Sequence, residues 1–291
     1  MHVVITGAAG NLGSKLNALL ERAEWCSAVT ALDIVPVTAG KKTTGVLADV
    51  ADADDQRWRV PVAKADAIVH FATANPWPDG NWAESTKSFD MTANLLAVAG
   101  TERHCRFVFA SSNHAMGGYK DHPIPGDGKI RMTTPARSGT RFFIPGEGYH
   151  YGAPYGATKI MGERATLARA RESRGMVSGI ALRIGWCQGG VNDPRTVNSS
   201  GKPGEPVGQP ADEMARDYRW FRNMWLSNAD YERLMTAVLT SGTDRWPGPG
   251  IIVPGVSNNR TTAWALDETR AWTGYDPQHD IWTELGLDPS A

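Results

Sequence analysis

The segment TGAAGNLG at residues 6–13 constrains the fold of this 291-residue chain more than any other feature. It follows an apolar, β-branched run at residues 2–6 that predicts a buried strand, and it precedes a helical pattern at residues 11–22. Its glycines permit a tight turn, close approach of the backbone to a phosphate and close packing of helix on strand. The start of the helix offers free N–H groups and a partial positive charge to a diphosphate. The residues of this loop that we expect to hold a dinucleotide are Gly7, Ala9, Gly10, Asn11, Leu12 and Gly13.

Short β-branched runs alternate with helical segments through the first half of the chain. This alternation predicts an α/β fold, a doubly wound parallel sheet with helices on both faces. The expected strands are residues 2–6, 29–33, 45–48, 67–71, 107–111, 179–184 and 251–253, and the expected helices are 11–22, 154–171, 228–241 and 263–273. Residues 116–150 and 188–217 are rich in Gly, Pro, Asp and Ser, and their length indicates either functional or disordered loops.

The pattern also suggests how the chain divides. We expect a dinucleotide-binding Rossmann domain at residues 1–186, completed by parts of 228–255. We expect a smaller substrate-binding lobe from residues 187–227 and 256–291. Both long loops follow strand ends, where this kind of sheet binds its ligands.

Asp33 ends the second expected strand, 20 residues after Gly13. A carboxylate at this position accepts hydrogen bonds from the adenosine ribose hydroxyls. No basic residue follows before Lys41, so the extra phosphate of NADP would meet a like charge without a counter-ion, and the sequence favours NAD. Further residues at or beside strand ends are expected around the cofactor: Ile34, Asp49, Val50, Phe71, Ala72, Thr73, Ile184 and Cys187.

Tyr155 and Lys159 stand four residues apart in a helical segment and therefore project from one face. A tyrosine is a poor base at neutral pH, but a nearby ammonium group stabilises its phenolate form. Ser112 ends the strand at residues 107–111 and would stand at the ligand edge of the sheet, where it could align a substrate hydroxyl. The sequence therefore predicts Ser112, Tyr155 and Lys159 as catalytic residues, with the last two also contacting the cofactor. Tyr151 lacks a lysine four residues on, because that position is Tyr155.

Composition excludes several other classes. The net charge is -1 with scattered basic residues, which gives no footprint for nucleic acid or an anionic membrane. The three cysteines, Cys26, Cys105 and Cys187, lack the spacing of a disulfide framework or a zinc site, so we expect no metal. No signal peptide or membrane-spanning run is evident. We expect a soluble cytoplasmic protein that acts on a small molecule.

Several stretches together identify a family. TGAAGNLG, ALDI, DAIVHFAT, FVFASSNHAMG, YGATK and ALRIG, followed by SNNRTTAWAL and TGYDP, resemble the extended short-chain dehydrogenases/reductases, the NAD-dependent epimerase/dehydratase family. Within it, SSNH and RIG-x-C are most similar to the bacterial uronate dehydrogenases. This resemblance implies NAD-dependent oxidation of the anomeric carbon of a hexuronic acid to a lactone, and a homodimer by analogy.

The resemblance also implies residue roles. Tyr155 would remove the proton of the C1 hydroxyl, Lys159 would hold the cofactor ribose and the phenolate, and Arg219 would clamp a substrate carboxylate. Arg216 or Arg222 could serve in place of Arg219. The substrate-binding residues expected in full are Asn75, Ser112, Asn113, His114, Tyr155, Trp186 and Arg219.

The chain departs from the uronate dehydrogenase pattern at Trp186, where a serine is expected, and at Ser88, where an asparagine is expected. Both long loops are also expanded. We therefore expect an acidic hexose, such as a uronic acid or a sulfonated hexose, and keep a neutral aldose open. The alternatives are a nucleotide-sugar epimerase with tightly bound NAD and a non-catalytic dinucleotide sensor; Asn113-His114 disfavours a dehydratase, and the retained Tyr155 and Lys159 disfavour the sensor.

Overall fold

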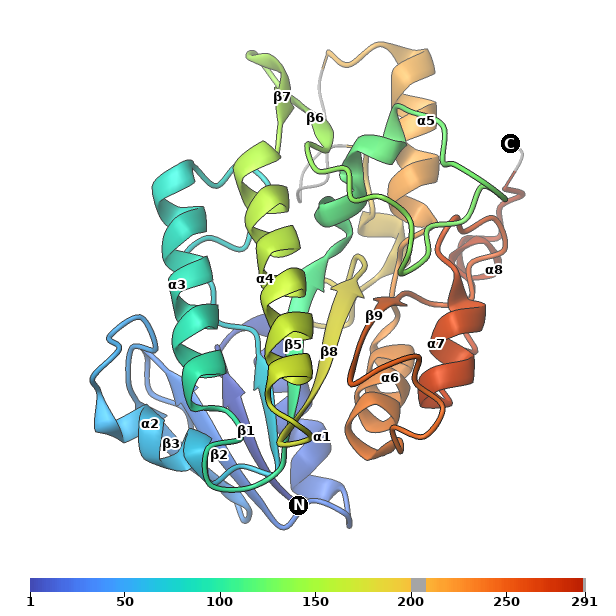
Figure 1. Ribbon diagram of the computed structural model, residues 1–291. Coiled ribbons are helices and arrows are strands. Elements are labelled where there is room, and N and C mark those ends of the chain that lie inside the picture. Colours follow the sequence, from blue (N-terminus) through green and yellow to red (C-terminus); the bar gives the residue numbers. More distant parts are fainter. Residues whose placement is uncertain (200–207, 290–291) are drawn as a thin grey trace.

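A seven-stranded parallel sheet forms the centre of the computed structural model, which describes residues 1–199 and 208–289 (Figure 1). The strand order is β3-β2-β1-β4-β5-β8-β9. The strands are β1 His2–Thr6, β2 Ala28–Asp33, β3 Thr43–Leu47, β4 Ala67–His70, β5 Cys105–Ser112, β8 Val177–Ile184 and β9 Gly250–Gly255. The chain runs outward from β1 in one direction and then continues from β4 in the other. The order therefore reverses between β1 and β4, the point at which folds of this kind bind ligands. The expected doubly wound parallel sheet is confirmed.

Alternating side chains of the strands build one core on each face of the sheet, as the twofold repeat of a strand requires. On β1, Val3 and Ile5 belong to one core and Val4 to the other. The first core packs against α1 Asn11–Arg22 and α6 Asn228–Thr240. The second packs against α2 Gln56–Ala63 and α3 Trp82–Val98.

Helix α4 Ala153–Glu172 lies beside α3 across β5 and β8, and Figure 1 shows the two helices next to each other in front of the sheet. The remaining helices follow β8. They are α5 Ala211–Arg222, α7 Leu266–Thr273 and α8 Ile281–Leu285, together with the short 3-10 helix η2 Pro194–Thr196. No helix among residues 1–199 and 208–289 is both long and apolar enough to cross a membrane.

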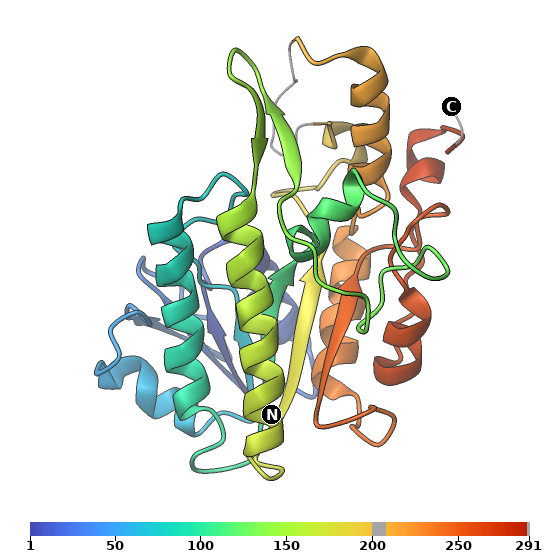
Figure 2. The same cartoon turned by 45° about the horizontal axis from the view of Figure 1, so that its top comes forward.

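The connection at residues 116–150 is structured. The 3-10 helix η1 Asn113–Lys120 begins directly at the end of β5, and a hairpin follows, made of β6 Arg141–Ile144 and β7 Gly148–Tyr151. Figure 2 shows this hairpin standing above the first turn of α4. Between these elements, Ile130 forms a bridge with Trp264 that ties the connection to the C-terminal part of the chain. The second long segment, 188–217, was expected to be a loop, but its end forms the first half of α5.

Candidate active site

A cavity of about 750 Å³ opens at the carboxyl ends of β1, β2, β4, β5 and β8. This is the edge where the strand order reverses, so the topology alone places the cavity here. Every residue expected to hold the cofactor lines it: Gly7, Ala9, Gly10, Asn11, Leu12, Gly13, Asp33, Ile34, Asp49, Val50, Phe71, Ala72, Thr73, Tyr155, Lys159, Ile184 and Cys187. Five of the seven residues expected to bind substrate line it as well: Ser112, Asn113, His114, Tyr155 and Trp186.

The glycine loop has no room for side chains. Gly7 has φ +67°, and a Cβ there would lie 2.8 Å from the backbone nitrogen of Ala72. A Cβ on Gly13 would lie 2.2 Å from the carbonyl oxygen of Gly7. Helix α1 starts beside this loop, and its N-cap residue, Gly10, makes no side-chain capping bond. The first N–H groups of α1 are therefore available to a diphosphate, so the loop fits NAD.

Asp33 is held beside the glycine loop. Its Oδ2 accepts a hydrogen bond from the backbone N–H of Ala9 at 2.9 Å, and its Oδ1 accepts one from the N–H of Val35 at 3.2 Å. These bonds fix the carboxylate at the mouth of the cavity, where the remaining lone pairs can accept from ribose hydroxyls. Asp49 lies farther along the same wall and forms an ion pair with Lys87 at 3.5 Å.

The opposite wall is tied to α1. Asn11 Nδ2 donates to the carbonyl oxygen of Cys187 at 2.8 Å. Lys15 Nζ donates to the carbonyl of Gln188 and, at 2.7 Å, to Asn228 Oδ1. The segment after β8 therefore lies across the start of α1, and it encloses the glycine loop from the side opposite to Asp33.

Tyr155 and Lys159 occupy the first turns of α4 and are only 9% and 8% exposed. Lys159 Nζ lies 5.4 Å from the centre of the Tyr155 ring and donates to the carbonyl oxygen of Ala110 at 2.8 Å. Burial raises the pKa of the Tyr155 phenol to about 12, and a hydrogen bond with Ser112 opposes that change. Burial lowers the pKa of the Lys159 ammonium to about 8. Tyr151, by contrast, is 65% exposed at the end of β7.

Ser112, Asn113 and His114 form the turn from β5 into η1. Ser112 Oγ accepts from the N–H of His114 at 3.2 Å, which holds the serine next to the tyrosine. The His114 ring meets the Tyr155 ring edge-on at 5.6 Å, and its Nδ1 lies 2.7 Å from Thr140 Oγ1. Burial lowers the pKa of His114 to about 4, so the imidazole is uncharged at neutral pH. Asn113 Nδ2 donates to the carbonyl oxygen of Ile184 at 3.4 Å.

The structure does not bring Asn75 and Arg219 to the cavity wall. Asn75 builds a turn, because its Oδ1 accepts from the N–H of Trp77 and its Nδ2 donates to Glu84. Arg219 lies on the exposed side of α5. The two other arginines considered for its role are also occupied elsewhere. Arg216 pairs with Asp121, and the Arg222 guanidinium stacks over the Tyr218 ring at 4.5 Å.

Sequence reasoning missed part of the wall. Pro76, Trp77 and Pro78 line the cavity from the loop after β4. Gln188 and Gly189 line it from the segment after β8. The sequence Pro76-Trp77-Pro78 could have indicated this part of the wall, because a tryptophan in a proline-rich loop can cover a pocket.

A buried ion pair behind the catalytic residues was also missed. Glu163, on the same face of α4 one turn beyond Lys159, accepts from Arg183 Nε at 2.8 Å and from Arg183 Nη2 at 2.9 Å. Ser111 Oγ donates to the same carboxylate at 2.7 Å. This pair fastens α4 to β5 and β8, so it fixes the distance between the tyrosine and the strand that carries Ser112.

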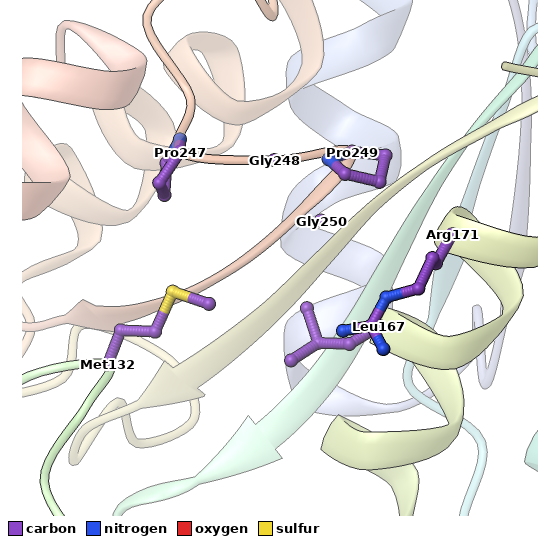
Figure 3. A pocket seen from close by; sticks show the side chains of 7 residues that line it. All are labelled: Met132, Leu167, Arg171, Pro247, Gly248, Pro249 and Gly250. Atoms are coloured by element: carbon purple, nitrogen blue, oxygen red, sulfur yellow. The ribbon is translucent and has the colours of Figure 1, made fainter.

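A smaller cavity of about 150 Å³ lies at the opposite end of the sheet, between α4 and the start of β9 (Figure 3). Met132, Leu167 and the Pro247–Gly250 segment form most of its wall, and Arg171 supplies the one charged side chain. It contains no nucleophile or acid–base pair. This smaller cavity therefore offers no catalytic group.

Comparison with known proteins agrees with this geometry. A family model described as "NAD dependent epimerase/dehydratase family" matches residues 3–189. An NAD-dependent glucose-6-phosphate dehydrogenase from Haloferax volcanii is 26% identical over 284 residues, which cover 95% of this chain and 92% of that protein.

Two solved structures are similar over nearly the whole chain. A glucuronic acid dehydrogenase from Chromohalobacter salexigens has 25% identity and a TM-score of 0.69, covering 98% of this chain and 87% of its own. A uronate dehydrogenase from Agrobacterium tumefaciens shows the same fold, with a TM-score of 0.69, 23% identity, and coverage of 97% of this chain and 86% of its own.

Proposed function

Because this chain belongs to the NAD dependent epimerase/dehydratase family, we propose that it oxidises the anomeric hydroxyl of a sugar to the lactone. The cofactor of the family is NAD, which takes up a hydride when bound. One observation carries the proposal: Tyr155, Lys159 and Ser112 line the same cavity as the glycine loop and Asp33. This shared lining supports an acid–base group and a cofactor site in one cavity.

Tyr155 is the proposed general base. Its phenol must lose a proton to act, and in the absence of ligands burial holds its pKa at about 12. The Lys159 cation lies close enough to stabilise the phenolate, and with a pKa of about 8 it keeps its charge at pH 7. The Ser112 hydroxyl would share the substrate hydroxyl with Tyr155 and hold it in line for proton transfer.

Oxidation is favoured over epimerisation by the named relatives. The Haloferax volcanii protein and the Chromohalobacter salexigens protein are both named as dehydrogenases, of glucose 6-phosphate and of glucuronic acid. Both names describe acidic sugars, so we propose an acidic hexose as the first substrate to test. Lys159 is the one Lys or Arg on the cavity wall among the described residues, so neutral aldoses belong in the same test. The residues 187–227 and 256–291 are proposed to form the lobe that receives the sugar.

The test is a panel of uronic acids, a sulfonated hexose, glucose 6-phosphate and neutral aldoses, assayed for NADH formation, with the lactone identified by NMR. We expect one class to support steady turnover. Tyr155→Phe should lower kcat by about 10²- to 10⁴-fold, the usual contribution of a general base. Tyr151→Phe is the matched control, because Tyr151 is an exposed tyrosine at the end of β7, four residues before Tyr155.

The panel also separates the alternatives. An epimerase would keep NAD through purification and give no net NADH from any free sugar. A dinucleotide sensor would bind NAD with the same affinity in Tyr155→Phe and would turn over nothing. Failure of every cyclic sugar would refute oxidation at C1.

A further inference from the structure

Thr140 reaches the active site from the long connection between η1 and β6. Its side chain is fully buried, and its Oγ1 lies 2.7 Å from His114 Nδ1. Its carbonyl oxygen accepts from the N–H of Gly152, the N-cap residue of α4, at 2.9 Å. Thr140 is thus fixed between the turn that carries His114 and the helix that carries Tyr155.

The neighbouring backbone is shaped to admit this hydroxyl. A Cβ on Gly117 would lie 1.5 Å from Thr140 Oγ1, a distance that no packed side chain tolerates. Glycine at position 117 is therefore required for the Thr140 hydroxyl to stand where it does. Gly117 and Thr140, which are 23 residues apart in sequence, therefore pack closely where Thr140 bonds His114.

The hydrogen bond decides which ring nitrogen of His114 carries the proton. A neutral imidazole has one donor nitrogen and one acceptor nitrogen. The Thr140 hydroxyl has no second partner among the described residues, and an imidazole nitrogen is a stronger acceptor than an alcohol oxygen. The distance of 2.7 Å also suits an O–H donor better than an N–H donor, whose bonds average about 2.9–3.0 Å. The hydroxyl therefore donates to Nδ1, and the ring proton lies on Nε2.

We propose that Thr140 is a positioning residue that fixes the Nε2–H tautomer of His114, so that the cavity presents a hydrogen-bond donor beside Tyr155. Among the described residues, the His114 ring makes its one hydrogen bond through Nδ1, to Thr140, which leaves Nε2 without a partner there. His114 also lines the cavity. The Nε2–H group would donate a hydrogen bond to an acceptor oxygen of the substrate, next to the hydroxyl that Tyr155 deprotonates. The assignment of that oxygen to a sugar rests on the proposed function, whereas the tautomer does not.

The tautomer is measured without any substrate. A long-range ¹H–¹⁵N correlation spectrum of the ¹⁵N-labelled full chain, with His114 identified by its loss in His114→Asn, should show an unprotonated Nδ1 and a protonated Nε2. Thr140→Val keeps the shape of the side chain but removes the hydroxyl. In this variant the proton should no longer be confined to Nε2, so the spectrum should show Nδ1 protonated in part or in full. Gly117→Ala should do the same by displacing the hydroxyl. Thr140→Ser should restore the wild-type pattern.

A protonated Nδ1 in the wild type would overturn the proposal, and so would a Thr140→Val spectrum with the tautomer unchanged. Thr134→Val is the matched control, because Thr134 is a buried threonine of the same connection whose hydroxyl bonds only local backbone. It should leave His114 as in the wild type.

Turnover gives a second readout with the best sugar of the panel. Thr140→Val should lower kcat/KM by about 3- to 10-fold, the effect of one lost neutral hydrogen bond, mainly through a higher KM for the sugar. Affinity for NAD should stay within about twofold, and Thr140→Ser should recover most of the loss. An equal loss in Thr140→Ser and Thr140→Val would refute the role of the hydroxyl. If no sugar is oxidised, the proposed function fails while the spectra still decide the tautomer.

Discussion

Lys159 is a buried cation, and the burial of its charge lowers the stability of the folded protein. Its Nζ lies 5.2 Å from the centre of the Phe109 ring, and its one hydrogen bond among the described residues goes to the carbonyl oxygen of Ala110. Burial lowers its pKa from 10.5 to about 8. Replacing Lys159 with Met removes the charge but keeps a flexible apolar stem. We therefore expect Lys159→Met to be inactive but more stable than the wild type at pH 7.

The magnitude follows from the structure. A fall in pKa from 10.5 to about 8 corresponds to about 3 kcal/mol of unfavourable burial at neutral pH. The hydrogen bond to Ala110, worth about 1.5–3 kcal/mol for a charged donor, is lost at the same time. The net gain in the free energy of unfolding is about 1 kcal/mol, and this corresponds to a rise in Tm of about 2–4 °C for a chain of this size.

The assay is urea unfolding of both proteins without added NAD, at pH 7 and again at pH 10. Between pH 8 and pH 10.5 the unfolded chain keeps the Lys159 proton that the folded chain has released. Wild-type stability therefore rises with pH in this window relative to Lys159→Met, and the advantage of the variant disappears. Tyr155 does not disturb the comparison at pH 10 or below, because burial raises its pKa to about 12 and the folded protein keeps its phenol protonated, while the unfolded chains titrate alike. A variant that is less stable than the wild type at pH 7, or a difference that does not change with pH, would refute the reasoning.

Two other predictions concern the cofactor. Asp33→Ala should weaken NAD binding about tenfold or more in calorimetry, because charge-assisted hydrogen bonds to the ribose are lost. Asp33→Asn keeps an acceptor for the N–H of Ala9 and should lose less affinity. An unchanged affinity in Asp33→Ala would show that the ribose does not bind at Asp33. Gly13→Ala should also reduce NAD affinity by at least tenfold, because its Cβ would lie 2.2 Å from the carbonyl oxygen of Gly7; Gly248→Ala, where a Cβ meets nothing within 4 Å, is the control and should bind NAD normally.

Local patterns suffice to bring the residues expected around the cofactor to one cavity. The glycine loop, Asp33 and Ser112 each sit at a strand end, and strand ends of a parallel sheet meet at one edge whatever the details of packing. Tyr155 and Lys159 share a helix face by spacing alone. The glycine loop and these four side chains line one cavity because their positions depend only on short-range structure and on the strand order.

Helix α3 shows how a local signal can be hidden. Its polar residues Ser85 and Thr92 are buried beside apolar ones, because the helix packs against both α2 and α4, so its hydrophobic periodicity is weak. A capping box of Asn81 and Glu84 marks its start, and this spacing was readable in the sequence.

The substrate end depends on long-range contacts that no periodicity encodes. Thr140 meets His114 across 26 residues, and Arg183 meets Glu163 across 20. Resemblance assigns Arg219 to a substrate carboxylate, but the structure places its side chain on an exposed face of α5. The side chains at the proposed sugar end of the cavity therefore need the structure to be located, whereas local patterns already bring together those at the proposed cofactor end.

The polar residues of α4 show how burial separates structural groups from catalytic ones. Tyr155, Lys159 and Glu163 follow each other at intervals of four, and all three are buried. Glu163 accepts three hydrogen bonds, so its charge is satisfied within the protein. Within residues 1–199 and 208–289, Lys159 uses one of its three donors, and Tyr155 bonds Ser112 alone. Buried polar groups are costly unless they are bonded, so the unused hydrogen-bonding capacity of these two residues supports the proposal that cofactor and substrate bind beside them.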